Sequence, residues 1–218
     1  SSANRGACLQ TCRKAYVVTE IETGYQLEID NEYIMSPKDL CTIPFFDRVI
    51  EAGVTVFKIE GRARPPEYVK TVSLAYNEAI DACLNKSFSN EKVEIWLKKL
   101  ETVFNRGFWD GYYLGRKFGE WNNQYGSKAT KRKKYIAQAT NYFSKIGIAE
   151  FLVQAGEIRV GDEVLIIGTN TGVIELIITE IRKDLINVEK AAKGDIISIP
   201  VTEKIRRADK LYLLETVL

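Results

Sequence analysis

Two cysteines near the start of the chain, Cys8 and Cys12, have the residue type and the spacing to hold a soft metal. Positive charge stabilises the thiolate form that binds metal, and three basic residues lie close by in sequence: Arg5, Arg13 and Lys14. An iron–sulfur cluster normally takes four protein ligands, and only seven residues precede Cys8. We therefore expect the pair to supply part of a cluster site whose other ligands lie upstream. Two ordinary loop thiols are the alternative.

The two remaining cysteines do not obviously complete this ligand set. Cys41 stands at the start of a predicted helix, just after a predicted strand, and is either a further ligand or a structural residue. Cys83 falls on the apolar face of a later helix, where a free cysteine behaves as a small core side chain.

A second group with chemical potential consists of Lys58, Glu60 and Arg62. Residues 54–59 are rich in β-branched side chains and predict a strand, on which Lys58 and Glu60 share one side and favour each other's charged form. Arg62 follows a tight exit at Gly61 and has the forked guanidinium that binds carboxylates or phosphates. We expect these three to be catalytic, because reactive groups of α/β barrels follow the strands. The alternative is an ion pair that closes the barrel.

The preceding predicted strand, residues 33–36, leads to Ser36 and Lys38. A helix connects this strand to the strand at residues 54–59, so the two strands should run parallel and release the chain on one face. We expect Ser36 and Lys38 to bind substrate there. The alternative for Ser36 is to cap a turn.

Five basic residues form a run that predicts a hinge: Lys128, Lys131, Arg132, Lys133 and Lys134. A solvated linker is one interpretation. Contact with RNA phosphates is the other, and it would make binding dependent on salt.

The composition of the chain excludes several kinds of catalytic site and argues against a secreted, disulfide-rich protein. The chain has 218 residues, a formal net charge of +2 and no histidine, so it cannot supply a Ser-His-Asp triad, a Cys-His dyad or an HExxH zinc site. The four unevenly spaced cysteines do not form a secreted disulfide framework. Neither a membrane-spanning apolar run nor a signal peptide is evident, so we expect a soluble cytoplasmic protein without a membrane partner.

The order of elements before residue 130 predicts α/β structure. A helix with Ile43, Phe46, Val49 and Ile50 on one face should end at Gly53, and a second should open at Pro65 and Pro66 with these residues on its apolar face: Tyr68, Val72, Tyr76, Ala79 and Cys83. Strands that alternate with helices build a parallel sheet. We expect residues 1–90 to be the last βα units of a TIM-like α/β barrel.

The middle of the chain, residues 91–133, is expected to hold a helix at about 91–105 and an aromatic and basic connector. Four aromatic residues in it either stack on bases or pack within the connector: Trp109, Tyr112, Tyr113 and Trp121.

Residues 134–218 are expected to form a small antiparallel β-barrel. Its strands should include residues 164–167, 174–181 and 196–199, and the dipeptides Gly161-Asp162 and Gly194-Asp195 should form equivalent turns.

Several segments, in this order, resemble the collagenase-like proteins of unclassified peptidase family 32 (U32). They are Asn4-Arg-Gly-Ala-Cys8 with Cys12-Arg13, Tyr33-Ile-Met-Ser-Pro-Lys-Asp-Leu40, Phe57-Lys-Ile-Glu-Gly-Arg62 with Tyr68-Val69, Ala79-Ile-Asp81, and Arg106-Gly-Phe-Trp-Asp-Gly-Tyr112. The resemblance covers essentially the whole chain. It implies that the front of the barrel and two cluster cysteines lie upstream, and that the full-length protein binds a four-iron four-sulfur cluster.

The resemblance carries three functional hypotheses. Within the family, the chain most resembles the branch that hydroxylates the wobble uridine of tRNA, which implies tRNA and a small prephenate-like carboxylate donor as partners. The alternative is the collagenase-like protease of the family name, although the chain offers no recognisable nucleophile–base pair. The third is a non-catalytic RNA-binding module. We expect this chain alone to be inactive.

Overall fold

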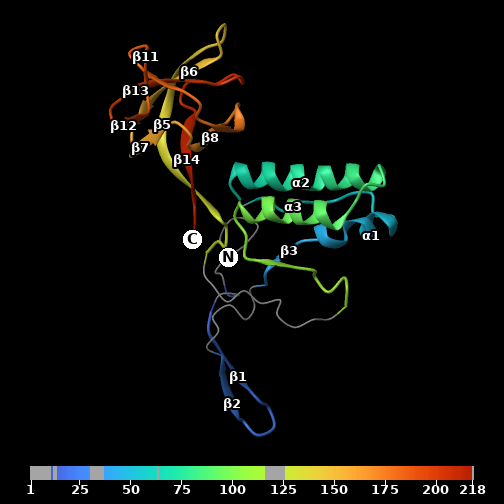
Figure 1. The fold of residues 1–218 in the computed structure, drawn as a ribbon. Coiled ribbons are helices and arrows are strands. Elements are labelled where there is room, and N and C mark those ends of the chain that lie inside the picture. The colour runs from blue at the N-terminus through green and yellow to red at the C-terminus, as the bar shows by residue number, and fades with distance from the viewer. Residues whose placement is uncertain (1–10, 12–13, 30–36, 63, 116–125, 218) are drawn as a thin grey trace. The chain divides into compact units, whose positions relative to one another are not determined.

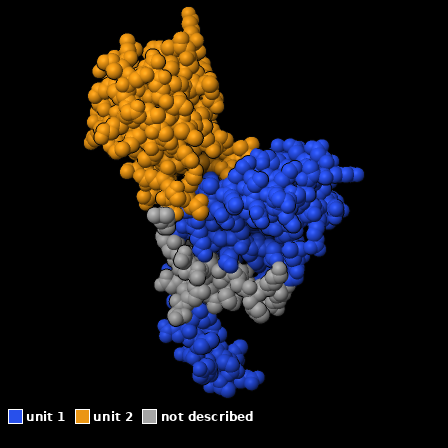
Figure 2. All heavy atoms as spheres, viewed as in Figure 1, with its two compact units in different colours: residues 1–58, 75–129 blue, residues 59–74, 130–218 orange. Residues whose placement is uncertain are grey.

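The computed structural model describes residues 11, 14–29, 37–62, 64–115 and 126–217. The chain divides into two compact units, one of residues 1–58 and 75–129 and one of residues 59–74 and 130–218 (Figures 1 and 2). No helix within the described ranges is both long and apolar enough to cross a membrane.

The first unit is built mainly from helices. They are a 3-10 turn at Ile43–Phe45, α1 at Phe46–Glu51, α2 at Pro66–Leu84 and α3 at Asn90–Glu101, with residues 66–74 of α2 grouped with the second unit. Two small sheets accompany them: the antiparallel pair β1 (Tyr16–Thr19) and β2 (Gln26–Ile29), and the parallel pair β3 (Asp39–Leu40) and β4 (Phe108–Trp109).

The predicted helices are confirmed, because each carries its apolar residues on one face and has a local start signal. Ser89 caps α3 by accepting a hydrogen bond from the backbone N–H of Lys92 at 3.5 Å. Phe46 is fully buried, and its ring lies 5.3 Å from that of Tyr76 and 4.9 Å from that of Phe57. These aromatic contacts join α1, α2 and the segment after α1 into one core.

The predicted strand at residues 54–59 is wrong, since this segment has no regular secondary structure. A strand needs a neighbour to satisfy its backbone groups, and Val56 is 84% exposed, with no strand paired to its segment among the described residues. The expected neighbour at residues 33–36 lies outside the described residues. The described part of the chain contains one parallel pairing, the two-residue pair β3–β4. The assignment of residues 1–90 to the last βα units of a TIM-like barrel stays a prediction.

The second unit contains an antiparallel sheet of eight strands in the order β11-β10-β13-β6-β5-β14-β8-β9 (Figure 1). These strands are β5 (Lys131–Phe143), β6 (Ile148–Val153), β8 (Glu163–Gly168), β9 (Gly172–Ile177), β10 (Ile181–Lys183), β11 (Ile186–Val188), β13 (Ile196–Pro200) and β14 (Lys210–Thr216). Two further strands, β7 (Glu157–Arg159) and β12 (Lys190–Ala192), pair with each other. Fully buried apolar side chains fill the core, among them Ile136, Phe151, Ile166, Ile197 and Leu211.

The expected closed barrel is not observed among the described residues. The edge strand β9 pairs with β8, and the other edge strand β11 pairs with β10, so no ladder joins the two edges. The predicted strand at residues 174–181 is interrupted: β9 ends at Ile177 and β10 begins at Ile181.

The two Gly-Asp turns are confirmed as one repeated device. Gly161 and Gly194 have φ angles of +93° and +98°, which glycine adopts without steric cost. In each turn the carboxylate of the following residue accepts a backbone N–H three residues earlier: Asp162 from Arg159 at 2.8 Å and Asp195 from Ala192 at 2.9 Å.

Candidate functional site

The predicted metal ligands Cys8 and Cys12, the substrate residue Ser36 and the aromatic residue Trp121 lie outside the described residues. Their roles stay predictions. The other predicted site residues can be placed.

Glu60 and Arg62 form a local hydrogen-bonded turn rather than the end of a strand. The Oε1 atom of Glu60 accepts the backbone N–H of Arg62 at 2.8 Å, and both side chains are exposed. Lys58 is exposed as well but is grouped with the first unit, whereas Glu60 and Arg62 belong to the second. Because residues 54–59 form no strand, Lys58 and Glu60 do not share a strand face. Their catalytic role stays a prediction.

Lys38 lies half-buried in the first unit, beside the β3–β4 pair. Its Cδ atom is 3.7 Å from the position that a Cβ atom of Gly107 would take, and Cδ of Lys128 is 3.8 Å from the same point. Asp39 fixes this loop, because its Oδ2 atom accepts the backbone N–H of Arg106 at 2.9 Å. The aliphatic parts of Lys38 and Lys128 thus lie against Gly107, in a loop that the Asp39 carboxylate holds in place.

The side chain of Asn105 makes several hydrogen bonds to the backbone between α3 and β4. The side chain is 3% exposed, and its amide donates to the carbonyls of Val103 at 3.0 Å and Glu101 at 3.4 Å, while its Oδ1 atom accepts the backbone N–H of Gly107 at 3.0 Å. The Asn105 carbonyl also accepts the backbone N–H of Lys128 at 2.7 Å. A buried side chain with satisfied donors and acceptor holds this loop in one conformation.

The thiol of Cys41 is buried: the residue is 5% exposed and directly follows β3. Tyr76 of α2 faces it. The phenol oxygen of Tyr76 accepts the backbone N–H of Thr42 at 3.1 Å and lies 3.1 Å from the Thr42 hydroxyl. The sequence placed Tyr76 on the buried face of its helix but gave no signal for this polar contact, which depends on how α2 meets β3.

Both groups stay protonated near neutral pH. Burial raises the pKa of the Cys41 thiol, because an apolar environment disfavours the thiolate. Burial, followed by the charge of a Cys41 thiolate, raises the pKa of Tyr76 to about 12. A thiol in this state is a weak nucleophile, and no histidine in the chain can activate it.

The described residues do not make a metal site by themselves, since nowhere in them do three or more His, Cys, Asp or Glu side chains gather. Cys41 is a single buried thiol, and Cys83 lies half-buried on α2. An iron–sulfur cluster in the full-length protein would therefore depend on Cys8, Cys12 and further ligands.

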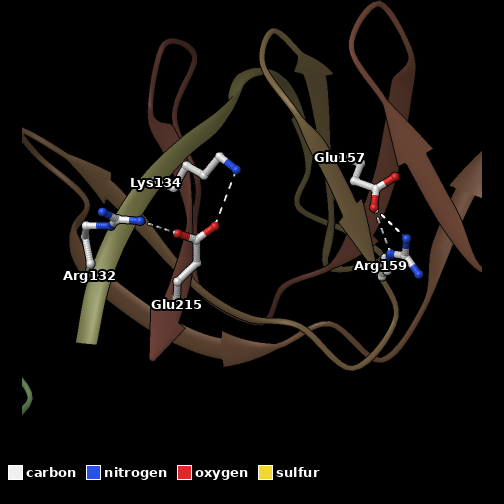
Figure 3. A network of polar contacts seen from close by, with 5 residues as sticks. All are labelled: Arg132, Lys134, Glu157, Arg159 and Glu215. Atoms are coloured by element: carbon white, nitrogen blue, oxygen red, sulfur yellow. Dashed lines mark hydrogen bonds and ion pairs between the residues drawn. The ribbon is translucent and has the colours of Figure 1, made fainter. Parts of the chain in front are cut away.

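The basic run at residues 131–134 opens strand β5 and is engaged in ion pairs, so it is not a free linker. Arg132 and Lys134 both contact Glu215, at 3.0 and 3.4 Å (Figure 3). Lys133 contacts Glu67 at 2.7 Å. Lys131 pairs with Glu163. Each of these cations already has a carboxylate partner, which lowers the positive field that it offers to RNA.

A further ion pair joins two residues of β7. Arg159 donates from Nε and Nη2 to Oε1 of Glu157 at 3.0 and 2.6 Å (Figure 3). The guanidinium holds the pKa of Glu157 below its usual range.

The described aromatic residues of the connector pack against aromatic neighbours. The rings of Trp109 and Tyr112 meet edge to face at 4.9 Å, and Tyr113 lies 6.0 Å from Phe45. These contacts favour the packing interpretation over base stacking for this segment.

Comparison with known proteins places the chain in a family. The model of peptidase family U32 matches residues 1–123. A collagenase of Porphyromonas gingivalis is 56% identical over 97% of this chain and 51% of its own length. An uncharacterized protease of Methanocaldococcus jannaschii is 34% identical over 98% of this chain and 53% of its own length. The chain thus spans about half the length of these relatives.

More distant similarity reaches proteins of RNA modification. The tRNA hydroxylation protein P1 of Bacillus subtilis is 32% identical over 76% of this chain and 40% of its own length. Among solved structures, the C-terminal domain of a Geobacillus thermoleovorans protein of the same family gives a TM-score of 0.35 at 18% identity, over 37% of this chain and 91% of that domain. The family assignment rests on the sequence matches. The relatives that match 97% and 98% of this chain are named as a collagenase and a protease, whereas the tRNA hydroxylation protein P1 of the expected branch matches 76% of it. The chain belongs to peptidase family U32.

Proposed function

We propose that the full-length protein is a collagenase-like peptidase. The observation that carries this proposal is the 56% identity to the Porphyromonas gingivalis collagenase over 97% of this chain. At that identity over so much of the chain, a shared fold and a shared general activity are the simplest expectation.

The complete hydrolytic centre would draw on residues beyond this chain. The chain contains no histidine, and Cys41, the most enclosed thiol of the described residues, is held protonated by burial. Glu60 and Arg62 are the exposed acid and cation that we assign to the active surface, with Glu60 as a general acid or base and Arg62 as a clamp for a substrate carboxylate or carbonyl.

The proposal is tested with full-length protein on denatured collagen. Cleavage should persist at constant specific activity through successive purification steps, and Glu60→Gln should lower it by roughly a hundredfold, as expected for a positioned acid or base. The matched control is Glu157→Gln, which removes an exposed carboxylate from the second unit far from Glu60 in sequence. Activity that separates from the protein during purification would refute the peptidase assignment.

A second candidate function is hydroxylation of tRNA, and a specific observation favours it. The Bacillus subtilis tRNA hydroxylation protein P1 is similar over 76% of this chain, and the pair Cys8 and Cys12 has the spacing to supply two ligands of an iron–sulfur cluster. In this proposal the cluster would supply redox chemistry, and the forked guanidinium of Arg62 would bind a small carboxylate donor resembling prephenate.

Anaerobic purification separates the two candidates. A brown protein that loses its colour in a Cys8→Ser, Cys12→Ser double variant, together with loss of the hydroxylated wobble uridine from tRNA of a deletion strain, would favour hydroxylation. Mass spectrometry of tRNA nucleosides measures the second result. A colourless protein and unchanged tRNA, with collagen cleavage intact, would favour the peptidase.

A further inference from the structure

Three aromatic residues lie at the end of β4 and in the turn that follows it, all within the first unit of the chain. Trp109 is the last residue of β4, and Tyr112 and Tyr113 belong to the turn. Tyr112 is 41% exposed and Tyr113 is 66% exposed, whereas Trp109 is half-buried. We call these three residues the 109–113 aromatic cluster. The catalytic chemistry proposed above makes no use of their exposed surface.

The backbone that presents the two tyrosines is held in a strained conformation. Gly111 and Tyr112 have φ angles of +64° and +65°, a region that a bulky side chain rarely adopts. Asp110 stabilises the turn, because its Oδ1 atom accepts the Tyr112 N–H at 3.3 Å and its carbonyl accepts the Tyr113 N–H at 3.2 Å. Residues strained in this way gather at ligand-binding sites.

The cluster rests on buried residues and continues into an exposed aliphatic side chain. The Tyr113 ring lies 6.0 Å from that of the buried Phe45. A Cβ atom on Gly111 would lie 2.5 Å from Cδ1 of Leu40 and 3.3 Å from the Tyr113 ring, so both side chains lie directly against the glycine. Leu40 is itself 53% exposed. The exposed rings therefore belong to a larger apolar surface with a fixed base.

The angle between the rings indicates which kind of group the cluster fits. The planes of Trp109 and Tyr112 are 87° apart, with ring centroids 4.9 Å from each other. A flat nucleotide base stacks on a single ring face and gains little from two faces at right angles. A proline ring is compact and puckered, so it can contact both faces at once. The geometry thus favours proline over a base.

We propose that the 109–113 aromatic cluster binds the proline-rich chain of denatured collagen in its polyproline II conformation, a role that rests on the peptidase function proposed above. Collagen chains repeat Gly-X-Y and are rich in proline. Proline-rich segments in this conformation dock on aromatic side chains in several unrelated binding domains, and their stiffness lowers the entropy that is lost on binding. The cluster holds the substrate chain and takes no part in breaking its bonds.

The backbone of such a substrate suits a tyrosine hydroxyl. Proline lacks the N–H that strand pairing requires, so a collagen chain is a poor partner for a sheet edge. A polyproline II chain makes no internal hydrogen bonds, and its carbonyls remain able to accept. Within the described part of the chain, the Tyr113 hydroxyl has no hydrogen-bond partner. It can therefore donate to a substrate carbonyl while the rings contact proline.

The test measures binding separately from cleavage. The 218-residue chain is titrated with a fluorescent Pro-Pro-Gly repeat of about 15 residues, which spans roughly 45 Å at the polyproline II rise. An Ala-Ala-Gly repeat of the same length is titrated in parallel. Fluorescence anisotropy should show that the proline peptide binds roughly tenfold more tightly or better, as expected for an aromatic anchor site.

Three variants of the cluster separate the ring from the hydroxyl. Tyr113→Ala should weaken binding of the proline peptide by roughly tenfold or more. Tyr113→Phe keeps the ring and should weaken it by about two- to tenfold, the equivalent of one hydrogen bond. Tyr112→Asn removes the second ring but keeps a residue that tolerates positive φ, so its loss of affinity reports the ring rather than the backbone.

The matched control is Tyr25→Ala, which removes a tyrosine side chain that is 71% exposed in the turn between β1 and β2. It should change the affinity by less than about twofold, as most residues outside a binding site do. Unchanged melting temperatures show that each variant is folded. Equal losses in Tyr25→Ala and Tyr113→Ala would indicate nonspecific adsorption and would overturn the proposal.

Cleavage of denatured collagen by the full-length protein distinguishes the two proposals. Tyr113→Ala should raise KM about as much as it weakens peptide binding and should leave kcat unchanged, because it removes binding that ground state and transition state share. Cleavage with an unchanged KM in this variant would refute the binding site but not the peptidase. Binding of the proline peptide through these tyrosines, without any cleavage, would refute the peptidase but not the site.

Two further results would overturn the assignment to proline. One is equal affinity for the proline and the alanine peptide, which would mean that the rings do not select proline. The other is displacement of the proline peptide by an oligouridylate as readily as by unlabelled peptide, which would assign the rings to nucleotide bases.

Discussion

Gly168 and Asp209 occupy adjoining space so tightly that a Cβ atom at residue 168 would overlap the Oδ1 atom of the Asp209 carboxylate. The absent side chain is thus what allows the buried aspartate to reach Thr171 and the backbone of Arg206. The glycine is required here for space.

Gly168→Ala should therefore destabilise the second unit by about 1–3 kcal/mol, the usual cost of overpacking, and more if the aspartate loses its partners. Urea unfolding followed by circular dichroism measures the change. In an Asp209→Ala background the same alanine should cost much less, since its clash partner is gone. Additive effects in this double-mutant cycle would contradict the packing argument.

The two Gly-Asp turns provide a second prediction. Gly161→Ala and Gly194→Ala should each lower the free energy of unfolding by about 1–2 kcal/mol, because alanine is strained at the φ angles of these residues. The two losses should be similar, since the turns share one geometry. Lys193→Ala, next to one glycine and exposed, is the control and should be close to neutral. A large difference between the two glycine variants would mean that the turns are not equivalent.

The buried side chain of Asn105 provides a third prediction. Asn105→Ala should cost about 1–3 kcal/mol, because the N–H of Gly107 loses its acceptor in a buried setting. Thermal unfolding of the first unit is the measurement. Asn187→Ala, on the exposed edge strand β11, is the matched control with the same change of side chain. Equal melting temperatures for the two variants would show that the buried contacts contribute nothing.

The pair Cys41 and Tyr76 predicts a dependence on alkaline pH. Both groups have pKa values raised in the folded protein, chiefly by burial. A raised pKa contributes stability that is complete below the unfolded pKa, about 8.5 for a thiol and about 10 for a phenol, and is lost as pH rises toward the folded value. For Tyr76 that value is about 12.

The free energy of unfolding should thus fall as pH rises from about 9 toward 12, as linkage requires. Tyr76→Phe keeps the ring against Phe46 but removes the ionisable hydroxyl. Its stability should be lower at neutral pH, since the Thr42 N–H loses an acceptor, yet it should decline less steeply with pH. Urea titrations at a series of pH values measure both slopes, and parallel curves for wild type and variant would rule out the phenol as the source.

Local signals in the sequence predicted much of the fold. The helices α1, α2 and α3 follow from apolar residues at helical spacing and from residues such as Ser89, which act within one turn. The Gly-Asp turns are equally local. The predicted strand at residues 54–59 shows where local signals stop being sufficient. Its β-branched residues favour extended backbone, but a strand forms only when a neighbouring strand is there to pair with it.

The candidate sites were less predictable for the same reason. The charges of Arg132 and Lys134 were visible in sequence, but their partner Glu215 is more than 80 residues away. The burial of the Cys41 thiol and its contact with Tyr76 likewise depend on how α2 meets the end of β3, which local sequence does not encode. The sequence around Arg206 and Arg207 likewise contains no local signal that the buried Asp209 holds their loop in place.

The edge strand β9 has a consequence for how this protein behaves at high concentration. An exposed strand edge is a template for another strand and hence for aggregation. Lys70 lies over this edge, donating to the Val173 carbonyl at 3.2 Å and pairing with Glu175 at 2.8 Å. The lysine acts as a gatekeeper: it occupies a backbone acceptor and places a hydrated charge where an incoming chain would have to dock. A side chain with no part in the proposed chemistry thus protects one edge of the sheet from pairing with another chain.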